Sequence, residues 1–561
     1  MQKNCLHVVK GMTYIVAGLV FLFSTTATSV AQERESLSSE VQTGQLAPDS
    51  AAALKKSAPL FSPQQYEALL QRKLARREEV AARYSTELLA PPGLPLEAGR
   101  PTEAKSAQTE FPPNPQNLVI GRNNKNTNAN NPDLASTLAE PAAANNSRQV
   151  FAAGNFNHAE ASPDGGITWY NIRIPGGPTA TPIACCDNDV TIDDARRVIF
   201  HSTLYINNAL TNGAVRIFVR RLPPAAACSY TITSAFFGGG NVLPDYPHIG
   251  LTKRFLYLTA NALPATGTGF ARIFRFNIDE MTDCATTHFR TFTRSYTNGQ
   301  RVWVPAEGTN NIETMYWVHH ENSTTLRIYS WSEDSNAPTT VTRTISASSF
   351  TNPDCRGGVG NFDFIERSTS FSITGFRTRC TAAPGANGGS GVLACYWNVG
   401  PDNAHIQGHV HAAVFSLSGL GLIAQPHVWN ANFCFGYPVV TANKRGDIGI
   451  SIALGGKAGG GGVAAQGYVG VDDEFTPGIG YFQTVIKTAN GTHNRSDSRY
   501  GDYFTIHPYE ACEKWFTATN YALEKGTGVS NVNSRYIEFG RNQSIRCYNT
   551  HSAHSPRYLP R

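Results

Sequence analysis

The stretch SPDGGITW, from Ser162 to Trp169, decides how the rest of this sequence is interpreted. It is too short and too rich in Gly and Pro to form a helix. Its Ser and Asp side chains can bond turn amides, its Gly residues can adopt a positive φ, and its Trp can pack against a neighbouring sheet. These properties fit a tight turn.

The sequence after about residue 116 consists of short β-prone runs separated by turn residues. Several runs share an opening in which a polar or aromatic cluster precedes a strand, a turn and a second strand. The openings begin near residues 185, 245, 435 and 500, and weaker counterparts lie near Trp303 and Asn361. This spacing suits the four-stranded blades of a propeller. We predict an all-β fold, a β-propeller of six or seven blades with seven favoured, over residues 116–561.

The opening stretch also carries a family signature. It matches the Asp-box S-x-D-x-G-x-T-W at every motif position, namely Ser162, Asp164, Gly166, Thr168 and Trp169. The chain therefore resembles the sialidase-like β-propeller superfamily. This resemblance implies that the stretch is a hairpin between the outer strands of a blade, away from the active face, and that Asp164 is structural and not a catalytic acid.

The resemblance implies the fold more strongly than the activity. Sialidases of that superfamily use an arginine triad, a Tyr/Glu nucleophile pair and an Asp acid/base, which we cannot place on matching positions of this chain. Their first arginine lies in an RIP motif before the first Asp-box, whereas Arg173-Ile174-Pro175 follows it here. We regard this RIP as coincidental.

The first 31 residues are typical of a secretory signal peptide. Lys3 and Lys10 make the start positive, an apolar run follows, and Ser29-Val30-Ala31 is a small-x-small cleavage site. The apolar run is short for a membrane span. We expect an exported protein, secreted or periplasmic, without stable insertion in a membrane.

Residues 32–115 differ in composition from the rest, being rich in Ala, Ser, Glu, Gln, Pro and Lys and free of Cys and Trp. Ser62 and Pro63 predict the start of one helix, which ends near Leu89 before Pro91-Pro92. We predict a helical N-terminal extension that is partly disordered or is a processed pro-segment.

Of the 11 cysteines, all but Cys5 follow the predicted cleavage site. Their even number after cleavage and the predicted export both favour disulfide bonds. Adjacent Cys185 and Cys186 are expected to bond to separate partners. The net charge of +5 is a small excess over 561 residues, which argues against a nucleic-acid partner.

The repeated openings supply the candidate site, because propellers bind ligands at loops that lead into their innermost strands. We predict a catalytic group of Asp245, His248, Tyr437, Arg499, Asp502 and Tyr503. We predict a substrate-binding group of Tyr246, Tyr500, His409 and His411, with His405 close by in sequence. Alternation along a strand places His409 and His411 on one face. Asp187 and Asp189 offer oxygen ligands for calcium, the one cofactor considered.

Two chemistries and one structural alternative fit these residues. Paired carboxylates, such as Asp187 or Asp245 with Asp502, could hydrolyse a glycosidic bond. A Tyr/His pair with Arg could remove the C5 proton of a uronic acid while Arg neutralises its carboxylate, as polysaccharide lyases do. The same residues could instead cap turns and satisfy buried hydrogen bonds.

The sequence thus favours an enzyme that acts on a polysaccharide or glycoconjugate at the mouth of the central channel, as a glycoside hydrolase or a polysaccharide lyase. The alternative is a non-catalytic extracellular propeller that binds glycan or protein. A deep site with convergent carboxylates or a Tyr/His/Arg group would favour catalysis.

Overall fold

The computed structural model of this chain describes residues 41–55, 68–69, 72, 75, 118–125, 140–146, 149–155, 158–221, 226–267, 269–295, 303–308, 312–350, 353–365, 378–383, 391–472, 480–496, 498, 500–501, 504–509, 512–524 and 532–541. The predicted signal peptide and most of the predicted helix lie outside them. All described residues belong to one unit of the chain, Val41–Arg561. Among them, no helix is long and apolar enough to cross a membrane.

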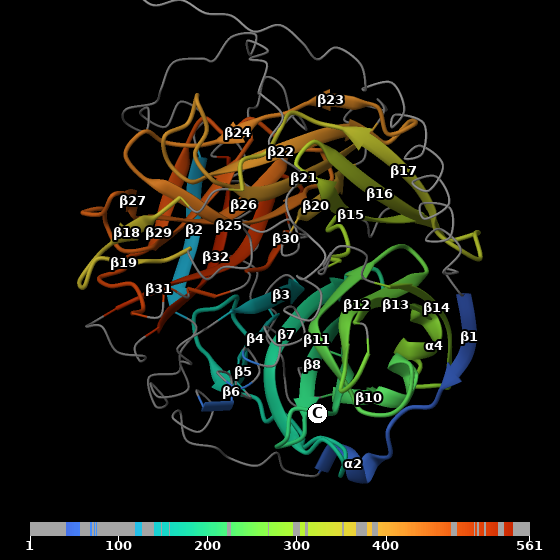
Figure 1. The fold of residues 1–561 in the computed structure, drawn as a ribbon. Helices are drawn as coiled ribbons and strands as arrows, with labels where there is room; N and C mark the ends of the chain where they lie inside the picture. The colour runs from blue at the N-terminus through green and yellow to red at the C-terminus, as the bar shows by residue number, and fades with distance from the viewer. Residues whose placement is uncertain are drawn as a thin grey trace, which may run out of the picture. The chain divides into compact units, whose positions relative to one another are not determined.

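Antiparallel sheets follow one another along the chain, and strands that are consecutive in sequence are neighbours in each sheet (Figure 1). The first sheet contains β3 (Ala142–Asn146), β4 (Gln149–Gly154), β5 (His158–Ser162) and β6 (Tyr170–Asn171). The second contains β7 (Ile183–Asp193), β8 (Val198–Ile206), β9 (Gly213–Arg221) and β10 (Ala226–Thr233). The third contains β11 (Val242–Leu251), β12 (Phe255–Pro264), β13 (Phe270–Asn277) and β14 (Thr287–Ser295).

The later sheets repeat this plan. The fourth contains β15 (Thr314–Asn322), β16 (Thr325–Ser332) and β17 (Thr339–Thr344). The fifth contains β20 (Arg379–Ala383), β21 (Val392–Val399), β22 (His409–Ser416) and β23 (Leu422–Ala424), with β24 (His427–Val428) also paired to β22. The sixth contains β25 (Cys434–Ala442), β26 (Ile448–Gly455), β28 (Gln466–Val471) and β29 (Val485–Ala489).

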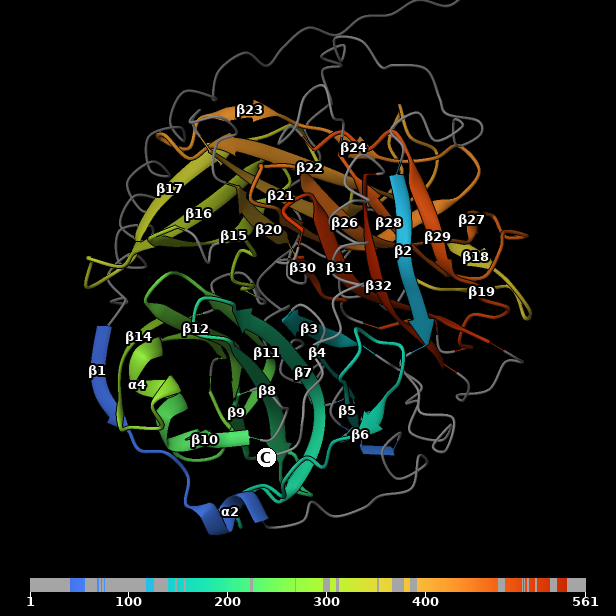
Figure 2. The same ribbon diagram turned by 180° about the vertical axis from the view of Figure 1, so that it is seen from behind.

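The seventh sheet joins two segments that are more than 400 residues apart in sequence. It contains β30 (Ile506–Pro508), β31 (Trp515–Leu523) and β32 (Val532–Arg541), and its last strand is β2 (Leu118–Lys125). The pairing of β2 with β32 runs antiparallel from Leu118 opposite Arg541 to Lys125 opposite Arg535. Figures 1 and 2 show β2 alongside β32 from both sides.

A few short elements lie outside this plan. They are β18 (Cys355–Gly357), β19 (Phe362–Asp363) and β27 (Lys457–Ala458), which form a small sheet, and the helices η2 (Ser234–Phe237) and α4 (Ile278–Thr282). The opening that the sequence suggested near Asn361 falls in this small sheet. The first strand of the fifth large sheet begins instead at Arg379.

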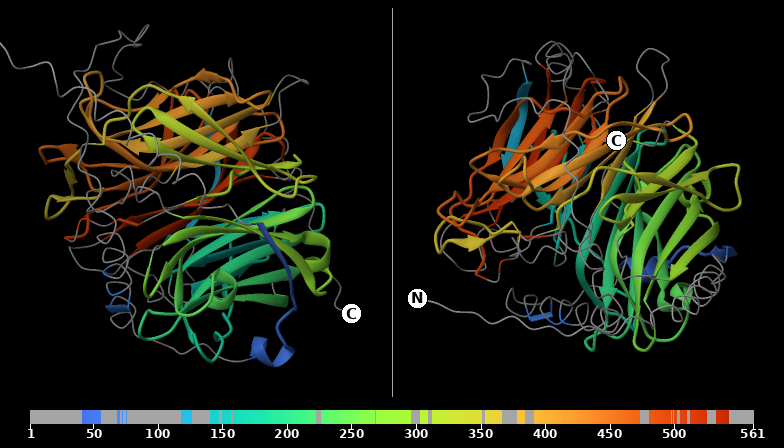
Figure 3. Two further views of the ribbon diagram at one scale, coloured as in Figure 1. Left: turned by 45° about the vertical axis from the view of Figure 1, so that its right-hand side comes forward. Right: turned by 45° about the horizontal axis from the view of Figure 1, so that its top comes forward.

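Part of the predicted extension packs on the third sheet. β1 (Val41–Leu46) pairs antiparallel with β14, along one edge of that sheet (Figure 3), and α2 (Ala51–Lys55) follows it. Further on, Leu69 is helical and buried in the hydrophobic cluster of the second and third sheets, and Arg72 Nη1 donates to the carbonyl of Asn208 at 3.1 Å. These contacts hold the extension against the sheets.

The first strands of successive sheets lie side by side. β7 contacts β3 and β11, while β25 contacts β20 and β30, and β30 contacts β3. Residues 303–308 connect β11 to β20: Val304 packs on Tyr246 of β11, and the Glu307 amide donates to the carbonyl of Cys380 at 2.9 Å. The first strands therefore share one region of the molecule, and the candidate site lies there.

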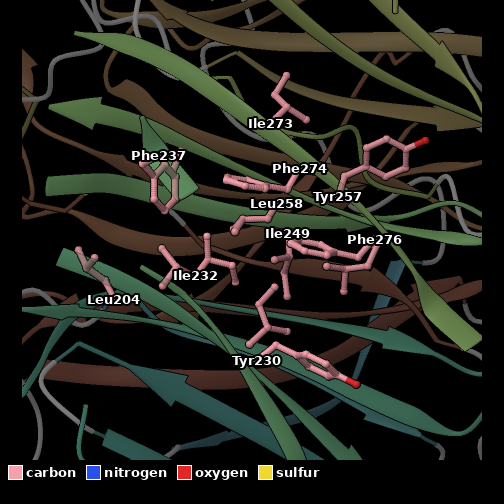
Figure 4. Packing of buried hydrophobic residues seen from close by; sticks show 14 of the residues in the cluster. Leu204, Tyr230, Ile232, Phe237, Ile249, Tyr257, Leu258, Ile273, Phe274 and Phe276 are labelled. Atoms are coloured by element: carbon pink, nitrogen blue, oxygen red, sulfur yellow. The ribbon is translucent and has the colours of Figure 1, made fainter. Parts of the chain in front are cut away.

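The hydrophobic core of the second and third sheets shows why these runs fold as strands. Figure 4 shows aromatic and aliphatic side chains of neighbouring strands packed between the sheets. The rings of Phe237 and Phe274 meet edge to face with centroids 5.2 Å apart. Burial of each such side chain contributes roughly 1.5–3 kcal/mol, so a sheet with alternating apolar positions is stabilised by its neighbour.

The disulfides correct one prediction. Cys185 and Cys186 are bonded to each other, not to separate partners. The remaining described disulfides are Cys228–Cys284, Cys355–Cys434 and Cys380–Cys395. Because residues 185 and 186 are consecutive, this first bond closes a ring within one stretch of β7 and ties no distant segments together.

SPDGGITW forms the predicted hairpin between β5 and β6. Asp164 Oδ1 accepts from the amides of Ile167 and Thr168 at 3.1 and 2.8 Å. Its Oδ2 accepts from the Thr168 hydroxyl at 2.7 Å, and the Ser162 hydroxyl donates to Oδ1 at 2.8 Å. Although burial alone would raise the pKa of Asp164, these hydrogen bonds lower it below its usual value.

The same hairpin also contacts the seventh sheet. The Trp169 ring lies edge to face with Tyr536 of β32 at 6.0 Å, and Asn124 of β2 donates to the carbonyl of Gly166 at 2.5 Å. Gly165 and Gly166 both have a positive φ, of 74° and 85°, which the turn requires. The hairpin is therefore a structural link between two sheets.

Asp164→Ala should destabilise the fold by about 1–2 kcal/mol, because it removes the acceptor for the turn amides. The measurement is the free energy of unfolding in urea. Asp334→Ala is the control, since Asp334 forms an exposed ion pair with Arg254 and its loss should cost less than about 0.5 kcal/mol. Equal losses in the two variants would contradict a structural role for the hairpin.

Candidate functional site

Three first strands carry the same backbone irregularity. The pairing register shifts between Ala184 and Asn188 in β7, between Asp245 and His248 in β11, and in β25 beside Tyr437. Each bulge contains a residue with positive φ, 55° at Asp187, 56° at Tyr246 and 57° at Tyr437. A positive φ is uncommon outside glycine and costs on the order of 1 kcal/mol. These bulges lie in three of the repeated sequence openings, those near residues 185, 245 and 435.

The bulges are tied to one another by side chains of preceding strands. Asn155 donates to Glu140 Oε2 at 2.8 Å and accepts from the Asp187 amide at 2.9 Å. Asp187 Oδ2 in turn accepts from the Tyr246 amide at 3.2 Å. These contacts satisfy the amides of Asp187 and Tyr246, which the bulges remove from the strand pairing. The first sheet thus holds the bulge of the second, and the second holds the bulge of the third.

Asp189 and His248 form a buried carboxylate–imidazole pair. Asp189 Oδ2 lies 3.0 Å from His248 Nδ1 and also accepts from the Ile249 amide at 2.9 Å. Burial, with the nearby positive charge of Arg379, lowers the pKa of His248 to about 4 despite the opposing effect of Asp189. The imidazole is therefore neutral near pH 7. A proton on Nδ1 that faces Asp189 leaves the lone pair of Nε2 to accept from Arg379 Nη2, which lies 3.3 Å away.

Arg379, at the start of β20, completes the group. Its Nη2 donates to the Tyr246 hydroxyl at 3.0 Å and lies 3.3 Å from His248 Nε2. The Tyr246 and His248 rings meet edge to face at 4.3 Å. All three side chains are buried. Tyr246, His248 and Arg379 are called the central triad below.

Two further titratable residues face the central triad and Asp189. Burial, with the negative charge of Asp189, raises the pKa of Glu307 well above its usual value, although Arg379 opposes this. His507 Nδ1 lies 3.7 Å from Glu307 Oε2, and its Nε2 lies 2.9 Å from the carbonyl of Val190. The Glu307 side chain keeps 20% of its surface exposed, whereas His507 keeps 4%. Glu307 is thus a carboxyl group with a raised pKa and partial exposure to solvent.

The structure brings together some of the predicted site residues and separates others. Asp187, Asp189, Tyr246 and His248 belong to the central group, and Asp245 is buried beside them in β11. Tyr437 and Tyr500 instead pack together in a hydrophobic cluster, with ring centroids 5.3 Å apart. The Tyr437 hydroxyl donates to the carbonyl of Phe364 at 3.1 Å. These two tyrosines therefore have a packing role in the described structure.

The other predictions fall elsewhere. His405, His409 and His411 form a separate group with His427. Arg499, Asp502 and Tyr503 lie outside the described residues and stay predictions. Asp187 and Asp189 already accept hydrogen bonds from backbone amides, and calcium binding by this pair also stays a prediction.

Sequence reasoning missed Glu307, Arg379 and His507. Glu307 follows the weak opening at Trp303, and His507 follows the opening near residue 500, so their positions after those openings were the available signal. Arg379 had none, because its strand begins without a polar or aromatic cluster. The Arg379 side chain reaches His248 only because β20 lies beside residues 303–308.

No family model and no curated protein matches the chain. Similar solved structures include an α-L-arabinofuranosidase from Fusarium graminearum with an iminosugar inhibitor, at 9% identity and a TM-score of 0.37, covering 76% of this chain and 99% of that one. A sialidase from Trypanosoma rangeli with the inhibitor DANA has 11% identity and a TM-score of 0.33, covering 58% of this chain and 53% of that one.

A fucose-binding structure is also similar, the Aleuria aurantia lectin with α-methyl-L-fucoside, at 10% identity and a TM-score of 0.30, covering 60% of this chain and 93% of that one. The enzymes and lectins among these similar structures are propellers. At TM-scores this low, the description of this chain depends on its own strands and contacts.

Acidification should destabilise the protein through His248. The unfolded chain binds a proton on this imidazole below pH 6.5 and the folded chain only below about 4, so stability falls as pH decreases between these values. In His248→Gln, the loss of unfolding free energy between these pH values should shrink by about 2–3 kcal/mol. The measurement is urea unfolding across this range. His288→Gln, which replaces an exposed histidine, is the control. An unchanged pH slope in His248→Gln would contradict the prediction.

Proposed function

We propose that this chain is a seven-bladed β-propeller that carries a glycan-processing site where its first strands meet. Three features support the fold: the succession of antiparallel sheets, the contacts between first strands, and the pairing of β2 with β32. In such a propeller β2 supplies the outer strand of the last blade. The Asp-box hairpin between β5 and β6 lies at the outer side of the first blade, as the sialidase-like resemblance implies.

The reaction that the site supports best is β-elimination on a uronic-acid glycan. The observation that carries this proposal is the convergence of Tyr246, His248 and Arg379 from two separate sheets. These are the residue types that a lyase needs: a cation for the carboxylate, a neutral base for the C5 proton, and a hydroxyl for the leaving oxygen.

His248 is suited to be the base. Asp189 fixes the orientation of its ring, and burial keeps the imidazole neutral. A uronate carboxylate that draws the Arg379 guanidinium toward itself would free Nε2 to take a proton. As the C5 proton moves to Nε2, the electron pair of the C5–H bond forms the C4–C5 double bond and the C4–O bond breaks. The leaving oxygen then takes a proton from the Tyr246 hydroxyl. The positive charge of Arg379 would stabilise both the uronate carboxylate and the oxygen of Tyr246.

Hydrolysis is the second candidate, and Glu307 favours it. Burial raises the pKa of this carboxyl group, and a raised pKa suits the general acid of a glycosidase. Asp189, whose negative charge contributes to the high pKa of Glu307, would be the second carboxylate. In this alternative Arg379 binds the substrate and His248 has no chemical role. We further propose that the protein acts outside the cytoplasm, as its disulfides favour.

The test is a screen of the purified protein on uronic-acid, neutral and sialylated glycans. Elimination produces unsaturated uronate, seen by its ultraviolet absorbance, whereas hydrolysis produces only new reducing ends. We expect absorbance with uronic-acid glycans, and a loss of about 10²–10³-fold in kcat/KM in Arg379→Lys and Arg379→Gln. Arg275→Lys is the matched control, because Arg275 is also buried over aromatic rings but lies outside the central triad.

Glu307→Gln separates the two reactions. Elimination should continue in this variant, since its base and cation remain. Reducing ends without absorbance, lost in Glu307→Gln, would replace elimination with hydrolysis. Glycan binding without either product in a folded protein would contradict both and favour a non-catalytic propeller.

A further inference from the structure

A group of imidazoles in the fifth sheet lies apart from the central triad. It consists of His405, His409 and His427, called the histidine cluster below. His409 begins β22 and His427 begins β24, and the two strands pair with Val410 opposite Val428 and His411 opposite His427. His405 belongs to the loop that precedes β22. A pairing of two strands and one loop thus brings together residues that are 4 to 22 positions apart in sequence.

The nitrogen atoms of the cluster converge. One ring nitrogen from each histidine lies within 4.8 Å of the other two. His409 Nε2 and His427 Nδ1 are 3.1 Å apart. Two nitrogen ligands of a tetrahedral zinc ion at about 2.0 Å are roughly 3.3 Å from each other, so this pair already has the required separation. A small rotation of the His405 ring would bring in the third nitrogen.

A carboxylate and a backbone carbonyl orient the rings of His405 and His409 toward a shared centre. Asp402 Oδ1 lies 2.9 Å from His405 Nδ1, which leaves Nε2 of that ring for a ligand. The carbonyl of Gln407 lies 3.1 Å from His409 Nδ1, which likewise leaves its Nε2. Metal-bound histidines characteristically donate their other N–H to a carboxylate or a backbone carbonyl in this way.

We propose that the histidine cluster binds one divalent transition-metal ion of the zinc class, through Nε2 of His405, Nε2 of His409 and Nδ1 of His427. The fourth position is open to water, and Asp402 orients His405. Three nitrogen ligands select zinc, copper or nickel over calcium and magnesium, which prefer oxygen. Without metal, the His427 Nδ1 proton bridges to His409 Nε2. On binding, that proton moves to Nε2 of His427, and no redox change occurs.

The ion would link the loop before β22 to β24, the short strand that pairs with β22. His411 stacks on His427 at 4.3 Å and has its Nδ1 3.1 Å from the Ser348 hydroxyl, so it supports the His427 ring from behind. The proposal rests on this geometry alone and does not depend on the proposed glycan activity.

The test uses the untagged mature chain, stripped with a chelator and dialysed against Zn²⁺. We expect one zinc ion per chain by elemental analysis and a rise in the melting temperature. Co²⁺ in place of Zn²⁺ should give the visible absorption of a tetrahedral nitrogen site. His405→Gln and His427→Gln should each weaken binding at least 100-fold. Asp402→Asn, an exposed substitution that leaves the core intact, should weaken it 10- to 100-fold.

His288→Gln is the matched control, since His288 is an exposed histidine paired with a carboxylate, Glu280, outside the cluster. It should bind zinc like the parent chain. A folded parent chain that binds no stoichiometric zinc would overturn the proposal. An affinity for zinc that is unchanged in Asp402→Asn and in every histidine variant that folds would also overturn the proposal.

Discussion

The bulges at Asp187, Tyr246 and Tyr437 are the constraint on which the centre of this structure depends. Each holds a non-glycine residue at positive φ, and each removes an amide from the regular pairing. Those amides are satisfied by side chains from a preceding strand, as the contact of Asp187 with Tyr246 shows. The neighbouring sheet therefore stabilises the bulge. This coupling positions His248 against Asp189 and Arg379.

Much of the fold could be predicted because local sequence patterns determine it. Asp164 and Trp169 lie in a motif whose residues contact one another within a few positions, so sequence alone reveals the hairpin. The repeated openings likewise mark strands whose bulges need particular side chains nearby. The vicinal bond of Cys185 could not be predicted, because the choice of sulfur partner depends on which strands meet in space.

The candidate site was predictable only where it coincides with those openings. Asp189 and His248 follow bulges and were found, whereas Arg379 begins a strand without any opening. Its contact with His248 spans 131 positions, and no periodicity encodes such a distance. The histidine cluster was likewise only partly predictable. The HVH alternation drew attention to His409 and His411, but the pairing of β24 adds His427 and changes the chemistry.

The pairing of β2 with β32 has a consequence for how the chain reaches its folded state. A strand near residue 120 finds its partner near residue 540, so this sheet cannot be completed until the chain has been made past residue 540. Until then β2 is without its partner strand, and its edge is open to other chains. Contacts of such long range slow folding. The newly made protein is therefore most prone to aggregation before β32 is synthesised.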